Sequence, residues 1–291
     1  MYDTIMPLMR CTICHQELHV SSTQEASASG EIIEGIVTCP TGHRWPVERG
    51  VLVFTREDAP SDPWSRSYAE YEKYRRYQET QLPLAAGEVA PLLERLAVGP
   101  TDVVLDLCTG SGGPLFNLLN HLDRETEVVA LDMSLAVQRH NRRYLLEQYG
   151  DRKVSFVSAD AAEVPFQEGA FAHVVSFGMS NMLDKMALGV GEAARVLEKG
   201  GTFTFTHMYV DEDSEGWRLL SAYMHEQGIE DFGFIGIERH FLALMDRVGF
   251  REYEVQVTNE VVGDPERDFE AGPLFPYPNE SMAELLVKAV R

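Results

Sequence analysis

The 291-residue sequence is poor in basic residues, in cysteine and in long apolar runs. It has 25 Lys and Arg against 46 Asp and Glu, a formal net charge of −21. Nucleic-acid binding draws most of its affinity from cations that meet phosphates, so this balance makes a nucleic-acid partner unlikely. Without an apolar run of about eighteen residues, no membrane partner is expected either. The first residues, M-Y-D-T-I-M-P-L-M-R, lack a basic start followed by an apolar block, so we expect a cytoplasmic protein.

The few cysteines are unevenly placed, with three of the four near the N-terminus. Cys11 and Cys14 form a C-x2-C pair, and Cys39 and His43 form a C-x3-H pair. Three thiolates and one imidazole make a closed tetrahedral zinc set, the type that supports structure. A disulfide is the poorer interpretation, because the compartment is expected to be reducing. These spacings predict a structural zinc on Cys11, Cys14, Cys39 and His43.

The composition divides the chain into a small module and a larger domain. Glu57–Pro63, E-D-A-P-S-D-P, is an acidic, proline-bearing linker. We therefore predict a zinc module over residues 1–57 and a second domain over 64–291. Within the module, the small polar residues of Ser21–Gly30 predict a loop.

The stretch Val103–Gly113, V-V-L-D-L-C-T-G-S-G-G, organises the larger domain. Its β-branched and apolar start predicts a strand that ends at Asp106. Gly110 and Gly112 allow a tight turn, and Pro114 stands where a helix would begin. A strand, a glycine turn and a helix are typical of a nucleotide-cofactor site in a doubly wound α/β domain.

Two further strands are predicted to end beside acidic residues. Val128–Asp132 ends in a carboxylate that can take both ribose hydroxyls of an adenosine. Val154–Ser158 leads to Asp160, which could meet an adenine amino group. A dinucleotide dehydrogenase is the alternative, but the run from Gly110 onwards, G-S-G-G-P-L, does not supply the third glycine of G-x-G-x-x-G.

This ordered set of motifs resembles the class I S-adenosylmethionine-dependent methyltransferases over residues 64–291. The family pattern after the first strand is D-x-G-x-G-x-G, and here Cys108 takes the place of the first glycine. The resemblance implies a doubly wound, mostly parallel seven-stranded sheet of Rossmann-like α/β type, with S-adenosylmethionine as cofactor. The cofactor-binding residues that it implies are Asp106, Cys108, Gly110, Gly112, Asp132, Met133, Asp160, Ala161 and Phe177.

The run R-W-P-V-E-R-G-V-L-V-F beyond His43 resembles a zinc-ribbon family that activates or fuses to methyltransferases. The zinc ligands also resemble those of the N-terminal ribbon of the large-subunit rRNA guanine-N1 methyltransferases. The function expected is methyl transfer to a small-molecule acceptor, a metabolite or natural product. The alternatives are an rRNA guanine methyltransferase and a partner-binding protein with a vestigial cofactor site.

The sequence contains fewer motifs for the residues that would bind the methyl acceptor than for those that would bind the cofactor. His207 follows the predicted fifth strand and is the candidate catalytic base, needed where an acceptor must lose a proton. A helix over Trp64–Tyr77 is expected to cover the cofactor, with Arg66 or Tyr68 in contact with it. The segment 259–281 is predicted to be a lid or insertion. The sequence leaves the acceptor atom and the oligomeric state open.

Overall fold

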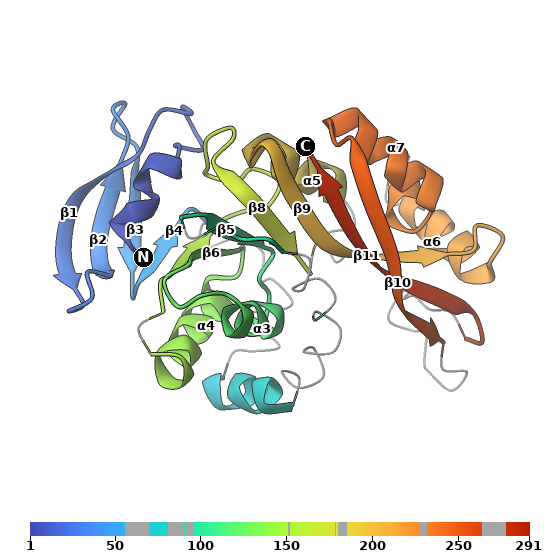
Figure 1. Cartoon of the computed structure of the whole chain (residues 1–291), viewed down its shortest axis with the longest axis horizontal. Coiled ribbons are helices and arrows are strands. Elements are labelled where there is room, and N and C mark those ends of the chain that lie inside the picture. The colour runs from blue at the N-terminus through green and yellow to red at the C-terminus, as the bar shows by residue number, and fades with distance from the viewer. Residues whose placement is uncertain are drawn as a thin grey trace.

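The structure is a computed structural model that describes residues 1–55, 70–80, 90, 96–99, 101–150, 152–177, 179, 185–226, 228, 232–263 and 278–291. Within these ranges, eleven strands form one sheet in the order β1-β2-β3-β4-β7-β6-β5-β8-β9-β11-β10 (Figure 1). The strands are β1 (His19–Ala26), β2 (Ile32–Thr38), β3 (Arg44–Glu48), β4 (Val51–Val53), β5 (Val103–Leu107), β6 (Glu127–Asp132), β7 (Val154–Ser158), β8 (Phe171–Ser176), β9 (Leu197–Val210), β10 (Glu252–Val262) and β11 (Ser281–Val290).

Along the chain, helices separate most of the central strands, as in a doubly wound fold, and β7 is followed by β8 without a described helix between them. They are α3 (Gly113–His121), α4 (Leu135–Gln148), α5 (Met186–Val196), α6 (Glu215–Glu226) and α7 (Glu238–Val248), with the short 3-10 helices η1 (Asp3–Leu8) and η3 (Gly233–Ile235). Residues 71–80 form a further helix. None of the described helices is long and apolar enough to cross a membrane.

The sheet is mixed and extends beyond the seven strands predicted. Six neighbouring strands, from β4 to β9 in space, run parallel, and antiparallel pairs lie on both sides of them. The extension arises because β4 pairs with β7, in register from Val51 opposite Phe156 to Val53 opposite Ser158. All three residues of β4 are buried. The N-terminal strands therefore continue the larger domain's sheet, where the sequence predicted a separate module.

One prediction within the N-terminal module was wrong. Most of the expected loop Ser21–Gly30 lies in β1, which pairs antiparallel with β2. The side chains of β1 are almost all exposed, so the strand carries no hydrophobic alternation that could mark it in the sequence.

The two faces of the sheet are covered by different helices (Figure 1). On one face, α3, α4 and helix 71–80 pack on a core that includes Val104, Ala130 and Val175. On the other face, α5, α6, α7 and η1 pack on a core that includes Phe203 and Phe205, whose ring centroids are 4.2 Å apart. A polar side chain at a strand end therefore faces either the core under α3 and α4 or the core under α5, α6 and α7.

Several predicted features lie outside the described residues. These are the linker Glu57–Pro63, the candidate contacts Arg66 and Tyr68, and most of the 259–281 segment. At its edges that segment is regular structure, since β10 runs to Val262 and β11 begins at Ser281.

Candidate cofactor site and cysteine–histidine cluster

The loop after β5 turns through three residues with positive φ: Cys108 at 63°, Gly110 at 54° and Gly112 at 85°. Gly112 also needs to be small, since a Cβ there would lie 2.6 Å from Oδ1 of Asn141 and 2.9 Å from the ring of Phe116. Cys108 holds a conformation that non-glycine side chains rarely adopt. The loop therefore brings its backbone tightly against the start of α3 and the side of α4.

Asp132, at the end of β6, holds this loop in place. Its Oδ2 accepts a hydrogen bond from the Gly110 N–H at 2.8 Å, and its Oδ1 accepts one from the Ser134 N–H at 2.9 Å. Each carboxylate oxygen can accept more than one hydrogen bond, and the side chain is half-exposed. Asp132 can thus fix the loop and still receive hydroxyl groups from a ligand.

Asp106, on the neighbouring strand, is only 2% exposed, and its Oδ2 has no hydrogen-bond partner in the described part of the chain. Burial, opposed by a hydrogen bond with Thr109 and aided by the charge of Asp132, raises the pKa of Asp106 to about 7. Buried polar atoms without partners are uncommon in folded proteins. A ligand that brings a cationic group or a hydrogen-bond donor would satisfy this oxygen.

The rim of the site is formed by residues after β6, β7 and β8. Met133 is 47% exposed, Ala161 is buried and Phe177 is half-buried. The carboxylate of Asp160 accepts the Ala162 N–H at 2.9 Å and forms an ion pair with Nζ of Lys185 at 2.7 Å. The structure thus brings the nine predicted cofactor residues to the carboxyl ends of β5 to β8. Lys185 was not predicted, because no motif surrounds it.

The thiol of Cys108 lies among the acidic groups of this site. Burial raises the pKa of Cys108 well above its ordinary value, and the charges of Asp132, Asp106 and Asp160 add to the shift. The thiol is therefore protonated at neutral pH and can serve only as a packing group or weak hydrogen-bond donor.

Helix 71–80 contacts the same loop from the other side. The Tyr74 hydroxyl lies 3.0 Å from the Ser111 carbonyl and 2.5 Å from Oδ1 of Asn141. The Gln78 side-chain amide donates to the same Ser111 carbonyl. Tyr74 and Gln78 are fully buried. The sequence predicted a leading helix over the cofactor site, but the spacing of its tyrosines did not identify which of them faces inward.

His207 lies on β9 but faces away from Asp106. It shares a face with Phe205, and its ring stacks on that of Phe241 in α7 at a centroid distance of 4.2 Å. Asp106 is in register with Val175, which belongs to the opposite core. The structure therefore does not bring His207 together with the cofactor loop.

The His207 side chain is enclosed and neutral. It is 1% exposed, and neither ring nitrogen makes a hydrogen bond of ordinary geometry within the described ranges. Burial lowers the pKa of His207 to about 4, and the nearby Phe234 backbone opposes this shift. The imidazole is consequently in its basic form at neutral pH.

The four predicted zinc ligands converge. The Sγ atoms of Cys11, Cys14 and Cys39 and a ring nitrogen of His43 all lie within 4.8 Å of one another. The Cys14 and Cys39 sulfurs are 3.6 Å apart, and Nδ1 of His43 lies 3.4 Å from the Cys39 sulfur. Zn–S and Zn–N bonds of about 2.3 and 2.0 Å predict tetrahedron edges of roughly 3.5–3.8 Å. The donor set and its spacing therefore fit a zinc ion.

Thr41 completes this cluster and was not predicted. Its hydroxyl donates to the Cys14 sulfur at 3.1 Å and lies 3.0 Å from the Cys39 sulfur. Hydrogen bonds, with that from Thr41 the largest, lower the pKa of the Cys14 thiol. In the sequence, only its position between Cys39 and His43 could have indicated that Thr41 lies beside the sulfurs.

Comparisons of the sequence with known proteins identify methyltransferases. Residues 92–215 match the ubiE/COQ5 methyltransferase family. The demethylmenaquinone methyltransferase of Porphyromonas gingivalis is 31% identical over 98 residues, which are 33% of this chain and 40% of the relative. The demethylmenaquinone methyltransferase of Clavibacter sepedonicus is 32% identical over 151 residues, 50% of this chain and 59% of the relative. The chain thus spans less than two thirds of these relatives.

Solved structures share the fold at lower identity. Geranyl diphosphate C-methyltransferase from Streptomyces coelicolor is 18% identical, with a TM-score of 0.56, over 81% of this chain and 90% of that protein. A complex between the Haloferax volcanii Trm112 methyltransferase activator and a putative methyltransferase contains a chain that is 20% identical, with a TM-score of 0.53. That match covers 80% of this chain and 99% of the other. The chain therefore has the fold of the class I S-adenosylmethionine-dependent methyltransferases, and its segment 92–215 matches the ubiE/COQ5 family.

Proposed function

We propose that the protein is an S-adenosylmethionine-dependent methyltransferase whose acceptor is a small molecule, a quinone precursor methylated on carbon. The match of residues 92–215 to the ubiE/COQ5 family carries this proposal. The names of the relatives supply the acceptor, since they include a ubiquinone/menaquinone biosynthesis C-methyltransferase from Coxiella burnetii, 33% identical over 99 residues. The arrangement of Asp106, Gly110 and Asp132 at the strand ends supports the cofactor.

Bound S-adenosylmethionine would supply a methyl group on a cationic sulfur. Asp132 would take the ribose hydroxyls, and Met133, Asp160 and Ala161 would surround the adenine. Asp106 has an unpartnered buried oxygen, which fits a ligand that carries positive charge. Cys108, Gly110 and Gly112 would bring backbone close to the ligand, and Phe177 would close the rim at the end of β8. Methyl transfer is an in-line displacement, so holding donor and acceptor in line supplies most of the catalysis.

His207 is proposed as the group that accepts the proton lost when an aromatic carbon is methylated. Its neutral, enclosed imidazole supports this role, which also requires the acceptor to reach the side of β9 that carries Phe205, opposite to the face of Asp106. The test compares His207→Gln with Phe241→Leu, which removes the stacked ring but leaves the imidazole. A base predicts that kcat falls about a hundredfold or more in His207→Gln alone, with an unchanged Kd for S-adenosylmethionine. Equal, small losses of activity in both variants would make His207 a packing residue.

A structural zinc on Cys11, Cys14, Cys39 and His43 is part of the proposal. The tetrahedral spacing of the four donors supports it, and the cluster leaves no ligand position for a substrate. The ion would hold the N-terminal strands, and with them β4, in the sheet.

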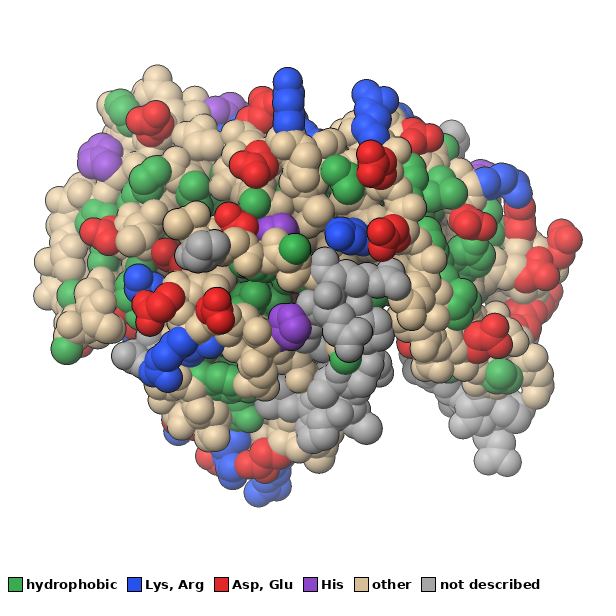
Figure 2. Space-filling model, viewed as in Figure 1, with side chains coloured by type: hydrophobic (Ala, Val, Ile, Leu, Met, Phe, Trp, Pro, Cys, Tyr) green, Lys and Arg blue, Asp and Glu red, His purple; other side chains and the backbone are tan. Residues whose placement is uncertain are grey.

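The surface charge favours the small acceptor over the rRNA alternative. In Figure 2, acidic side chains are spread over the face shown and grouped at its right-hand end, while basic ones lie singly or beside acidic ones. Among the described residues, Arg139 is paired with Glu48 and Arg195 with Glu192. A vestigial site is also less favoured, because the buried Oδ2 of Asp106 without a hydrogen-bond partner lowers stability unless a ligand binds there.

The experiment that tests the proposal measures binding and transfer together. Isothermal titration of the zinc-loaded chain with S-adenosylmethionine should give a single site, and NAD titrated in the same way should give none. Incubation with a demethylated naphthoquinol should then add one methyl mass to its ring. Failure to bind S-adenosylmethionine would remove the whole proposal, and binding with methyl transfer only to an RNA fragment would remove the small acceptor.

A further inference from the structure

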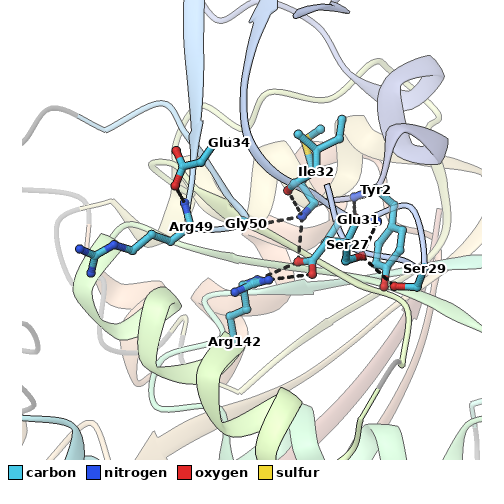
Figure 3. Close-up of polar contacts among 11 residues, drawn as sticks. Tyr2, Ser27, Ser29, Glu31, Ile32, Glu34, Arg49, Gly50 and Arg142 are labelled. Atoms are coloured by element: carbon cyan, nitrogen blue, oxygen red, sulfur yellow. Dashed lines mark hydrogen bonds and ion pairs between the residues drawn. The ribbon is translucent and has the colours of Figure 1, made fainter. Parts of the chain in front are cut away.

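A buried ion pair connects the N-terminal module to α4. Nε and a terminal nitrogen of Arg142 donate to the two carboxylate oxygens of Glu31 at 2.7 and 2.8 Å (Figure 3). The side chains are 14% and 7% exposed. The amino group of Met1 reaches the same carboxylate at 3.1 Å. Bidentate, water-excluded pairs of this kind fix geometry strongly.

The turn before β4 holds the guanidinium from the other side. A Cβ on Gly50 would lie 2.1 Å from Nε of Arg142, so a larger residue here would displace the guanidinium. Gly50 also has a φ of 78°. The Arg142 guanidinium is therefore enclosed between Glu31, before β2, and Gly50, before β4, so the N-terminal module fixes where it lies.

The residue next to Arg142 in the sequence contacts the cofactor loop. Nδ2 of Asn141 donates to the Gly110 carbonyl at 2.9 Å, and its Oδ1 lies in reach of the Tyr74 hydroxyl. Asn141 is fully buried, and a Cβ on Gly112 would lie 2.6 Å from its Oδ1. One turn of α4 thus touches the N-terminal module through Arg142 and the cofactor loop through Asn141.

We infer that the Glu31–Arg142 pair positions Asn141, and through it the loop at Gly110, so that the N-terminal module sets the affinity of the cofactor site. Arg142 is on this account a positioning residue that does not touch the cofactor. The inference rests on the proposed function, because it assumes that S-adenosylmethionine binds at this loop.

The physical reason is the cost of a buried charge without its partner. With Glu31 neutralised, Arg142 would have to turn towards water, and α4 would shift to allow it. A second pair, Arg139–Glu48 at 2.7 Å, joins the same two parts of the chain but is 29% and 39% exposed. Water can solvate either partner of that pair, and no described hydrogen bond connects Arg139 with the loop. It is the matched control.

The experiment titrates the zinc-loaded full chain with S-adenosylmethionine at 25 °C. Glu31→Gln should raise Kd by about three- to thirtyfold, the span of indirect couplings, while Glu48→Gln stays within about twofold of wild type. The effect should largely vanish in an Asn141→Ala background, because the two substitutions act on one path. A purely structural role would give the same factor in both backgrounds.

Glu31→Asp keeps the charge but has a side chain one methylene shorter. It replaces Glu31→Gln in the experiment if circular dichroism shows that Glu31→Gln does not fold. Its Kd should rise less, but measurably above that of Glu48→Gln. A wild-type Kd in either folded Glu31 variant, or an undiminished effect in the Asn141→Ala background, would overturn the inference while the proposed function stands. A wild-type chain that does not bind S-adenosylmethionine would instead refute the proposed function, and the inference with it.

Discussion

Gly110 lies in the loop after β5 and Asp132 is the last residue of β6, and one hydrogen bond of 2.8 Å joins them. The donor is a backbone N–H in the glycine turn, and the acceptor is a carboxylate oxygen at the end of β6. The same carboxylate also accepts the N–H of Ser134, next to the start of α4. A single acidic side chain therefore sets the turn, the entry into a helix and the proposed ribose site.

Replacing Asp132 should separate these roles. Asp132→Ala is expected to weaken S-adenosylmethionine binding by about 1.5–3 kcal/mol, because charge-assisted bonds to the ribose are lost with the bond to Gly110. Asp132→Asn keeps one acceptor oxygen and should lose less. Calorimetry measures both values. An unchanged affinity in Asp132→Ala would mean that the ribose is held elsewhere.

The raised pKa of Asp106 predicts a pH dependence of stability. Its folded pKa of about 7 lies above the unfolded value of about 3.9, so the folded chain binds more protons between these values. The free energy of unfolding should therefore fall as pH rises from about 4 to about 7, by at most ~4 kcal/mol from this group. Urea titrations at several pH values should show this fall in the apoprotein, and Asp106→Asn should lack it. An equal slope in both proteins would contradict the prediction.

The same group predicts how cofactor binding varies with pH. A cationic ligand group would meet an ionised Asp106, which burial disfavours below pH 7. S-adenosylmethionine should therefore bind more tightly as pH rises from 6 to 8. Asp106→Asn serves as the control and should bind weakly, with less dependence on pH. An identical pH profile in the variant would show that another group causes the change.

The sequence predicted most of the parallel core, because its signals there are local. The apolar run Val154–Ser158 is β7 to the residue, and the strand predicted over Val128–Asp132 is β6 without its first residue, Glu127. The glycines and acidic residues at the strand ends also predict the site, because they too form short, local patterns. By contrast, β4 pairs with β7 through residues far apart in the sequence, such as Val51 and Phe156. No local sequence pattern predicts a contact of this kind.

Two features of the site could not be predicted for similar reasons. The Glu31–Arg142 pair is a long-range contact between two residues whose charges look like ordinary surface charges in the sequence. His207 carried a positional signal at a strand end, but the sequence could not say which face of β9 it occupies. The register of β9 against β8, with Phe205 opposite Ser176, determines that.

The cysteine–histidine cluster predicts one tightly bound zinc per chain. Elemental analysis should find about one equivalent, and Cys39→Ser should lose it while Cys108→Ser retains it. Structural zinc contributes roughly 10–16 kcal/mol in small zinc modules, so chelation should also lower the thermal midpoint. Less than a tenth of an equivalent of any transition metal in the purified wild type would contradict the assignment.

The substrate class can be decided by the response to salt. An RNA enzyme should present a cationic track and lose affinity steeply as salt rises, because each neutralised phosphate releases counterions. This chain has a net charge of −21, and the arginines of α4 that could form such a track are engaged with Glu31, Glu48 and Glu147. We therefore expect no submicromolar binding of rRNA fragments in a mobility-shift assay at about 50 mM salt, where phosphate-driven binding is strongest.

The control for that assay is a charge variant of the same helix. Glu48→Gln and Glu147→Gln together release Arg139 and Arg143 from their partners and should create weak, salt-sensitive RNA binding where the wild type has none. That result would show that the assay detects a basic track and that the native pairs suppress it. Submicromolar, salt-sensitive binding by the wild type would reverse the conclusion.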